Sequence, residues 1–474
     1  MNDSNLAFLT LSDLAEMRKQ QKISALEITQ FYLHQIERYQ SDSYAFISIY
    51  REQAENQAKD IDSGSASSSP LSGLPYSVKD LIDVGNEITT AGSSVLDDNR
   101  ADQDAWVVSK MRQAGAICCG KNNLHEFAYG ATGENLLYGT ARNPYDARRL
   151  AGGSSSGSAA AVGWGMVPAA FGTDTGGSVR GPAALCGLVG FKPTLGRIST
   201  AGVLPYCWTL DHVGTITRSV RDAALLLETV AGHDPTDPSS SQVPCSDYSI
   251  SLPMSLKGIR IGLAKRFFFE RVDPEIQSAT QSVIDYLKTQ GVVFVEVELP
   301  DLEYARTVSL SVQMPEALSF HMRYLEDRAD RYSLDFRAGL ALGQNILAEH
   351  YIRASRMISF YRQQMGAIFN RVDFLITPGA PIIAPKVGTV AITEFGQKEA
   401  LGNAITRFTS FFNMTGNPAI TLPSGLHSSG LPMSVQIIGN NFEESAVLNL
   451  AHAVSEVGKF QIEPPQTPGV LPCN

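Results

Sequence analysis

Apolar residues along the chain repeat first with the period of a helix and later with that of short buried strands. In the first sixty residues, three of them recur at intervals of four and share one helix face: Ile28, Tyr32 and Ile36. Ser24 and Glu27 precede this stretch in the capping-box spacing that starts a helix. The pattern predicts N-terminal helices within residues 10–60, followed by a turn-rich linker at 62–73.

From residue 74 onward, short apolar runs bounded by Gly or Pro alternate with amphipathic stretches. Strands are predicted at 74–84, 116–122, 167–172, 188–194, 259–264, 292–299, 373–378, 418–423 and 433–439. Helices are predicted at 105–115, 158–165, 219–232, 275–290 and 444–458, and a mostly helical block fills about 303–370. Because strand and helix alternate at both ends of the chain, we predict an α/β fold with one sheet covered by helices. The helical block is a candidate insertion that caps a site.

Composition narrows the class of protein. The 474 residues are 43% hydrophobic and 18% charged, with 40 glycines, which suits a compact α/β enzyme and does not suit a disordered chain. The length permits two or three domains or a single large α/β unit. The net charge is −10 and no block of Lys or Arg stands out, so a nucleic-acid-binding surface is not expected.

The cysteines and the first residues of the chain indicate the cellular compartment to expect. The six cysteines, which include no CxxC pair, are Cys118, Cys119, Cys186, Cys207, Cys245 and Cys473. In a chain of this size they indicate reduced cytosolic thiols. The first residues lack the charged segment and apolar run of a signal peptide, and no stretch reaches the roughly 18 apolar residues of a membrane span. We therefore expect a cytoplasmic protein with no membrane partner.

The segment 152–165, which reads GGSSSGSAAAVGWG, raises the question of chemistry. A flexible linker stays polar on both sides, whereas this run leads into apolar residues. A phosphate-binding loop needs a lysine, and none stands between Lys121 and Lys192. A reactive serine is the interpretation that stays strongest.

Two serine sites compete for that role. Ser155 sits in a GxSxG pattern, but charged, turn-like residues precede it where a nucleophile elbow needs a buried strand. Ser178 follows Gly176 and Gly177, which let the backbone approach a ligand so that consecutive N–H groups converge on an oxyanion. Lys79 lies in an apolar strand ahead of both sites, although a lone lysine at such a position is more often simply solvated.

Several motifs together resemble those of the amidase signature family. The motifs are GLPYSVKDLID, GGSSSGSAAAV, GTDTGGSVRGPAALCGLVGFKPT and LPMSVQIIG, with ARNPYD and DHVGTITRSVRDAALLL as further matches. The likeness spans about residues 10–460. The resemblance implies a single amidase domain over 1–474, with a signature core at about 74–232. It also implies a large, mixed, mostly parallel sheet flanked by helices.

The resemblance assigns a Ser–cis-Ser–Lys triad to Ser178, Ser154 and Lys79, which makes the GxSxG match a coincidence. Ser178 is then the nucleophile, and Ser154 relays its proton to Lys79. Lys79 must be neutral to accept that proton, and burial would lower its pKa from about 10.4 toward about 7–8.

A row of backbone N–H groups is expected to hold the oxyanion: those of Thr175, Gly176 and Gly177, together with that of Ser178. Asp174 and Arg180 flank this loop and are candidates for a bracing ion pair, whose role could equally be structural. No cofactor is expected. No metal is expected either, because the HExxH pattern that begins at His125 lacks its second histidine.

Two functions follow from this resemblance. One is a free-standing amidase that cleaves the C–N bond of a small linear amide and releases ammonia or an amine. The other is the glutaminase (A) subunit of a tRNA-dependent amidotransferase. Such subunits usually carry an aspartate several residues before an N-x-x-G-x-P element, here NMTGNP at 413–418, and the preceding ITRFTSFF has no acid. We favour the free amidase, with a small-molecule amide as partner and a homodimer left open as its assembly.

The segment around this element also bears on the substrate. The candidates for an apolar pocket wall are Phe408, Phe411, Phe412 and Met414. Together with the missing acid, they favour a small uncharged or weakly polar primary amide over glutamine. Arg407 could pair with a substrate carboxylate, although a solvated arginine on a helix face is the simpler interpretation. Aryl, indole-acetamide and biuret- or urea-like amides all stay candidates.

Overall fold

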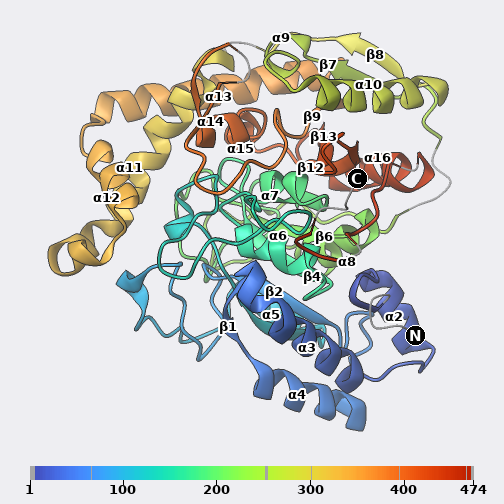
Figure 1. The fold of residues 1–474 in the computed structure, drawn as a ribbon. Coiled ribbons are helices and arrows are strands. Elements are labelled where there is room, and N and C mark those ends of the chain that lie inside the picture. The colour runs from blue at the N-terminus through green and yellow to red at the C-terminus, as the bar shows by residue number, and fades with distance from the viewer. Residues whose placement is uncertain are drawn as a thin grey trace.

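The N-terminal helices form as the capping pattern predicts. The computed structural model describes residues 6–65, 67–250, 255–299, 302–393, 396–458, 460–465 and 467–470. Helix α3 (Ala25–Ser43) begins at Ser24, whose Oγ accepts a hydrogen bond from Glu27 N at 3.1 Å. Helices α2 (Leu11–Lys19) and α4 (Arg51–Asp60) precede and follow it, and Figure 1 shows this group at one end of the molecule.

Eleven of the described strands form one mixed sheet, which crosses the molecule from the N-terminal helices to the opposite end (Figure 1). In spatial order they are β1 (Phe46–Ile49), β3 (Ile117–Asn122), β2 (Pro75–Lys79), β4 (Ala169–Thr173), β6 (Val213–Thr217), β5 (Val189–Lys192), β12 (Ala419–Leu426), β13 (Pro432–Gly439), β9 (Phe374–Pro378), β7 (Arg260–Leu263) and β8 (Val293–Glu296). A separate ribbon pairs β10 (Ala391–Ile392) with β11 (Glu399–Ala400). Every strand predicted from the sequence is present, and β1, β6, β10 and β11 are additional.

The α/β fold with a large mixed sheet is confirmed, but the sheet is not mostly parallel. Parallel pairing is confined to two runs, β3-β2-β4 and β9-β7-β8. The strands between these runs, and the edge strand β1, pair antiparallel with their neighbours. The connections explain the difference. A short turn joins β12 to β13 and can only reverse the chain, whereas parallel neighbours need a longer crossover.

Helices flank the sheet. Those that contact its strands include α5 (Trp106–Gln113), α6 (Ser156–Gly163), α7 (Arg180–Leu185), α8 (Val220–Val230), α10 (Pro274–Thr289) and α16 (Glu444–His452). Three shorter helices lie elsewhere along the chain: α9 (Lys265–Phe268), α14 (Leu401–Thr406), which contacts β10 and β11, and α15 (Phe411–Thr415), which contacts α11 and α13. Every residue of α6 is buried, which fits its small side chains and explains why the serine-rich segment is no flexible linker. Among the described helices, none combines the length and the apolar character that crossing a membrane requires.

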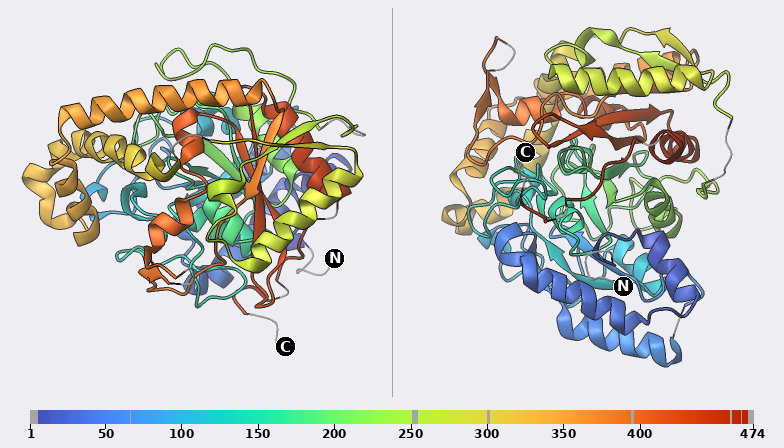
Figure 2. Two further views of the ribbon diagram at one scale, coloured as in Figure 1. Left: turned by 90° about the horizontal axis from the view of Figure 1, so that it is seen from above. Right: turned by 45° about the vertical axis from the view of Figure 1, so that its right-hand side comes forward.

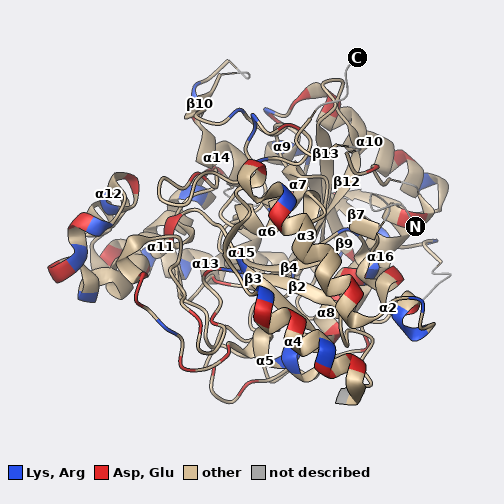
Figure 3. Cartoon of the chain, turned by 60° about the horizontal axis from the view of Figure 1, so that its bottom comes forward, with Lys and Arg blue, Asp and Glu red and all other residues tan. Residues whose placement is uncertain are grey.

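The predicted helical block at 303–370 consists of α11 (Leu302–Arg328), α12 (Leu334–Gly343) and α13 (Ala348–Phe369). These helices lie to one side of the sheet, and α11 contacts both α12 and α13 (Figures 1 and 2). In Figure 3, the positions of basic and acidic residues are interspersed along the helices that face the viewer. The five described cysteines are free, and Cys473 lies outside the described residues.

Candidate active site

Two adjacent parallel strands bring a lysine and a threonine to one edge of the sheet. Lys79 ends β2, and Thr173 ends the neighbouring strand β4. Lys79 is completely buried, and its Nζ donates hydrogen bonds to Thr173 Oγ1 and to Ser154 Oγ, each at 2.7 Å. The lysine that the sequence left as a lone residue is therefore held between two hydroxyl groups. Thr173 is a member of this site that sequence reasoning missed.

Burial changes the chemistry of this lysine. It lowers the pKa of Lys79 to about 7, because the ammonium form loses its hydration, although the carboxylates of Asp211 and Asp174 partly oppose the shift. A substantial fraction of Lys79 is therefore neutral near pH 7. The direction and size of the shift are those that the sequence analysis required of a general base.

Ser154 approaches the lysine from the serine-rich segment. The Gly153–Ser154 peptide bond is cis, in keeping with the family's cis-Ser position, and Ser154 O accepts a hydrogen bond from His125 N at 3.1 Å. The next residue, Ser155, is committed elsewhere: its Oγ donates to Thr173 O at 3.2 Å. Ser155 therefore stabilises the backbone beside the site, and the nucleophile-elbow interpretation gains no support from the geometry.

Ser178 lies in the loop after β4, beside the serine-rich segment. Its backbone O accepts a hydrogen bond from Ser155 N at 3.2 Å, which joins the two serine-bearing segments. Ser178 is 8% exposed, and its Oγ makes no hydrogen bond within the part of the chain that the structure describes. The structure thus brings Lys79, Ser154 and Ser178 to one place, with the hydroxyl of Ser178 uncommitted.

A buried ion pair fixes the loop before Ser178. The Asp174 carboxylate accepts hydrogen bonds from Arg180 Nη2 at 2.9 Å and from the backbone N–H groups of Gly177, Val179 and Arg180 at 2.8, 3.1 and 3.2 Å. Burial alone would raise the pKa of Asp174, but the Arg180 guanidinium, together with Lys192 and Asn413, holds that pKa well below its ordinary value. The expected bracing pair is therefore present, and it shapes the loop directly.

This bracing alters the expected oxyanion site. The Gly177 N–H already donates to Asp174, so it is not free for a substrate. The N–H groups of Thr175, Gly176 and Ser178 have no acceptor among the described residues. Gly177 keeps a different role, because its φ of +124° and the nearby Thr409 Oγ1 leave no room for a side chain. The N–H groups open to an oxyanion are thus those of Thr175, Gly176 and Ser178.

Further residues that the sequence did not single out support this loop. Thr175 Oγ1 donates to Asp211 Oδ1 at 2.5 Å, and burial raises the pKa of Asp211 to about 6. Asn413 Nδ2 donates to Asp174 O at 2.8 Å. Gln313, which belongs to α11, lies against this loop. Its Nε2 is 3.8 Å from the position that a Cβ on Gly176 would take. The helical block therefore reaches the site.

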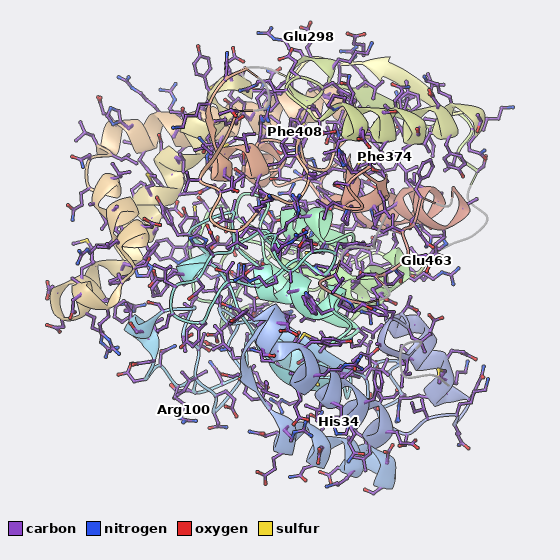
Figure 4. The ribbon with its side chains drawn as sticks, viewed as in Figure 1. His34, Arg100, Glu298, Phe374, Phe408 and Glu463 are labelled. Atoms are coloured by element: carbon purple, nitrogen blue, oxygen red, sulfur yellow. The ribbon has the colours of Figure 1, made fainter. Side chains whose placement is uncertain are left out.

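The apolar residues expected to line a pocket are instead part of the hydrophobic core. All four are at most 1% exposed: Phe408, Phe411, Phe412 and Met414. Figure 4 shows Phe408 within the molecule, whereas Glu298 lies at its outer edge. Arg407 is not a solvated arginine either. It is 8% exposed, forms an ion pair with Glu399 at 3.5 Å and donates to Arg271 O at 3.1 Å. Helix amphipathicity could not reveal the contacts of Arg407, because its partners Glu399 and Arg271 belong to other segments of the chain.

The HExxH-like segment holds no metal cluster in the described part of the chain. Glu126 accepts hydrogen bonds from Ser93 Oγ at 2.5 Å and from Ser333 N at 3.1 Å. Burial, together with a smaller contribution from the charge of Lys79, lowers the pKa of His125 to about 4. His125 Nδ1 lies 3.4 Å from Thr132 Oγ1, so both side chains make contacts within the fold.

Comparison with known proteins defines the class of this enzyme. The chain matches the family described as Amidase over residues 27–448. It is 39% identical over 470 residues to a Pseudomonas putida protein named Amidase, with 98% of this chain and 99% of that protein covered. It is 36% identical over 483 residues to a subunit of the glutamyl-tRNA(Gln) amidotransferase of Chromohalobacter salexigens, with 96% and 98% covered.

A solved structure agrees over nearly the whole chain. It is described as "An unexpected vestigial protein complex reveals the evolutionary origins of an s-triazine catabolic enzyme", and it matches with a TM-score of 0.91 at 32% identity, covering 95% of this chain and 99% of that one. The chain therefore belongs to the amidase signature family. It is a hydrolase of that family, which acts on amides.

Proposed function

We propose that the chain cleaves a small linear amide through an acyl-enzyme on Ser178. The observation that carries the proposal is the completely buried amine of Lys79, which lies 2.7 Å from Ser154 Oγ and has a pKa lowered to about 7. A buried amine that is half neutral near pH 7 can accept a proton, whereas a solvated lysine is almost entirely charged there.

The reaction runs in two halves. Ser178 Oγ forms a bond to the amide carbon while its proton passes to Ser154, whose own proton passes to Lys79 Nζ. The N–H groups of Thr175, Gly176 and Ser178 stabilise the negative charge that forms on the carbonyl oxygen. The C–N bond then breaks as the relay returns a proton to the leaving nitrogen, which departs as ammonia or an amine. Water repeats the sequence on the ester and releases the acid.

We favour a free-standing amidase over an amidotransferase component. The Pseudomonas putida relative, which is named Amidase, matches at higher identity than the amidotransferase relatives, which match at 34–36%. Glutamine also carries an ammonium that would need an acidic partner near the site. The Glu399 carboxylate already pairs with Arg407 and Arg271, so it is not free to bind that ammonium. The glutaminase role is the second candidate, because the amidotransferase relatives cover nearly the whole chain.

Ammonia release by the isolated chain tests this proposal. Glutamine, benzamide, indole-acetamide and biuret are assayed side by side, with Ser178→Ala as the inactive control. We expect turnover of at least one small amide without any partner, faster than that of glutamine, and none by Ser178→Ala. Glutamine as the best substrate, or activity only with partner proteins and tRNA, would establish the amidotransferase role instead. The homodimer stays a prediction, as do the single domain, the cytoplasmic location and the capping role of α11–α13.

A further inference from the structure

The pairing of two central strands continues beyond their ends and places an acid opposite the active-site loop. Strands β4 and β6 run antiparallel to each other. One residue beyond this ladder, Asp174 and His212 each donate the backbone N–H to the other's carbonyl oxygen, at 2.8 and 3.2 Å. The next pair in the same register is Thr175 and Asp211. Their side chains meet because residues that lie opposite each other in an antiparallel ladder are close neighbours.

The contact between Thr175 and Asp211 is short and buried. Thr175 Oγ1 donates to Asp211 Oδ1 at 2.5 Å, and the two residues are 3% and 8% exposed. Burial raises the pKa of Asp211 only to about 6, so the carboxylate is ionised at pH 8. A hydrogen bond from a hydroxyl to an ionised carboxylate is roughly twice as strong as one between neutral groups.

This bond is the one that fixes Thr175. Within the described residues Thr175 makes no other hydrogen bond, and its backbone N–H is among those open to an oxyanion. The rest of the loop is held by other groups: Asp174 accepts the Gly177 N–H at 2.8 Å, and Thr409 Oγ1 donates to Gly176 O at 2.7 Å. The direction of the Thr175 N–H therefore depends on the bond to the Asp211 carboxylate.

Asp211 is itself held firmly enough to serve as an anchor. Its second oxygen, Oδ2, accepts the backbone N–H groups of Tyr206 and Cys207, each at 2.9 Å. The turn that these bonds close is fastened to α11. The Tyr206 hydroxyl donates to Gln313 Oε1 at 3.2 Å. Glu316, on the same helix, accepts from Cys207 Sγ at 3.1 Å. The carboxylate thus connects a turn anchored on the helical block to the active-site loop.

We propose that Asp211 is a positioning residue for the reaction, which holds Thr175 so that its backbone N–H donates to the substrate oxygen as negative charge develops there. This inference rests on the proposed function and extends it. An oxyanion donor acts in the transition state, so misplacing it lowers kcat and leaves KM nearly unchanged. A carboxylate with a purely structural role would instead affect stability and leave kcat as it is.

Variants on both sides of the bond test the proposal at pH 8. Thr175→Val removes the hydroxyl at nearly constant volume, Thr175→Ser keeps it, and Asp211→Asn removes the charge. Asp222→Asn is the matched control. The buried Asp222 carboxylate also accepts two backbone N–H groups and one hydroxyl, from Leu11 and Ser12, but it fastens α8 to α2. The kcat and KM are measured with the amide that wild type turns over fastest, and melting temperatures show whether each variant is folded.

We expect Thr175→Val and Asp211→Asn each to lower kcat about 10- to 100-fold. This is less than the ~10²–10³ for removing an oxyanion donor, because the N–H is displaced and not lost. KM should change by less than about threefold. The double variant should be no slower than the slower single variant, since both changes break one bond, whereas independent effects would multiply. Thr175→Ser and Asp222→Asn should keep the wild-type kcat within about threefold, although Asp222→Asn should melt at a lower temperature.

A wild-type kcat in Thr175→Val, a loss that appears only in KM, or multiplied losses in the double variant would overturn the proposal. If Asp211→Asn does not fold, the comparison of Thr175→Val with Thr175→Ser decides. If wild type turns over no amide, the proposed function fails, and the rate at which a sulfonyl fluoride labels Ser178 decides instead, because a sulfonyl oxygen then occupies the oxyanion site. Slower labelling of Thr175→Val than of Thr175→Ser would support the role of Asp211, and equal rates or no labelling would refute it.

Discussion

Replacing Lys79 by methionine should abolish activity and yet stabilise the folded chain at neutral pH. The folded-state pKa of about 7 lies some 3.4 units below the ordinary value of about 10.4, and each unit corresponds to about 1.36 kcal/mol. At pH 7.5 the buried lysine therefore costs roughly 4 kcal/mol relative to the unfolded chain, in which it is charged and hydrated. Methionine avoids that cost but forfeits the hydrogen bonds to Ser154 and Thr173, at about 1 kcal/mol each. The net expectation is a gain of roughly 2 kcal/mol.

The sign of this effect changes with pH. Between the folded and the unfolded pKa, the unfolded state binds one more proton, so the stability of wild type rises with pH by about 1.36 kcal/mol per unit. At pH 9.5 the cost of the buried lysine has shrunk to roughly 1 kcal/mol, and the methionine variant should then be the less stable protein by about 1 kcal/mol. Other titrating groups are common to both proteins and cancel in the difference.

Urea unfolding of both proteins at pH 7.5 and 9.5 measures this difference, with Lys265→Met as the control because Lys265 is exposed. We expect the stability difference between wild type and Lys79→Met to change by roughly 3 kcal/mol over this range, and that for the control to stay nearly constant. A difference that does not depend on pH, or a methionine variant that is less stable at pH 7.5, would refute a depressed pKa for Lys79.

Three further predictions follow from the same geometry. The kcat/KM of wild type should fall about tenfold per unit as pH drops below about 7, because the ammonium form of Lys79 cannot accept a proton; a profile that is flat down to pH 5 would contradict this role. Lys79→Ala should be more damaging than Ser154→Ala, since water can replace the relay hydroxyl but not the base, and equal residual rates would count against the relay. Asp174→Asn should cost about 3–5 kcal/mol of stability by leaving Arg180 without its carboxylate, and an unchanged melting temperature would show that the pair does not hold the loop.

Much of the fold could be predicted because its strands and helices carry local signals. The capping box at Ser24 and the apolar runs bounded by Gly or Pro identify most elements correctly. Strand β6 escaped because its residues, VGTIT, offer little apolar contrast, and β1 escaped because it directly follows α3. Strand direction in the centre of the sheet depends on tertiary connections, which periodicity does not encode.

The candidate site, too, could be predicted only in part from the sequence. Lys79, Ser154 and Ser178 could be assigned because their motifs resemble those of a known family, and the structure brings them together. The commitment of Gly177 N–H to Asp174 depends on loop geometry that no spacing reveals. Arg407 looks like a solvated arginine in the sequence, because its contacts with Glu399 and Arg271 depend on how other segments fold against it.

Trapping the acyl-enzyme tests the central claim most directly. The chain is mixed with a turned-over amide and quenched in acid within one turnover, and the intact mass and the proteolytic peptides are measured. The account predicts that the protein gains the mass of the acyl group, that the group lies on Ser178, and that Ser178→Ala shows no gain. An adduct on Ser155, or turnover with no adduct on any serine, would contradict it.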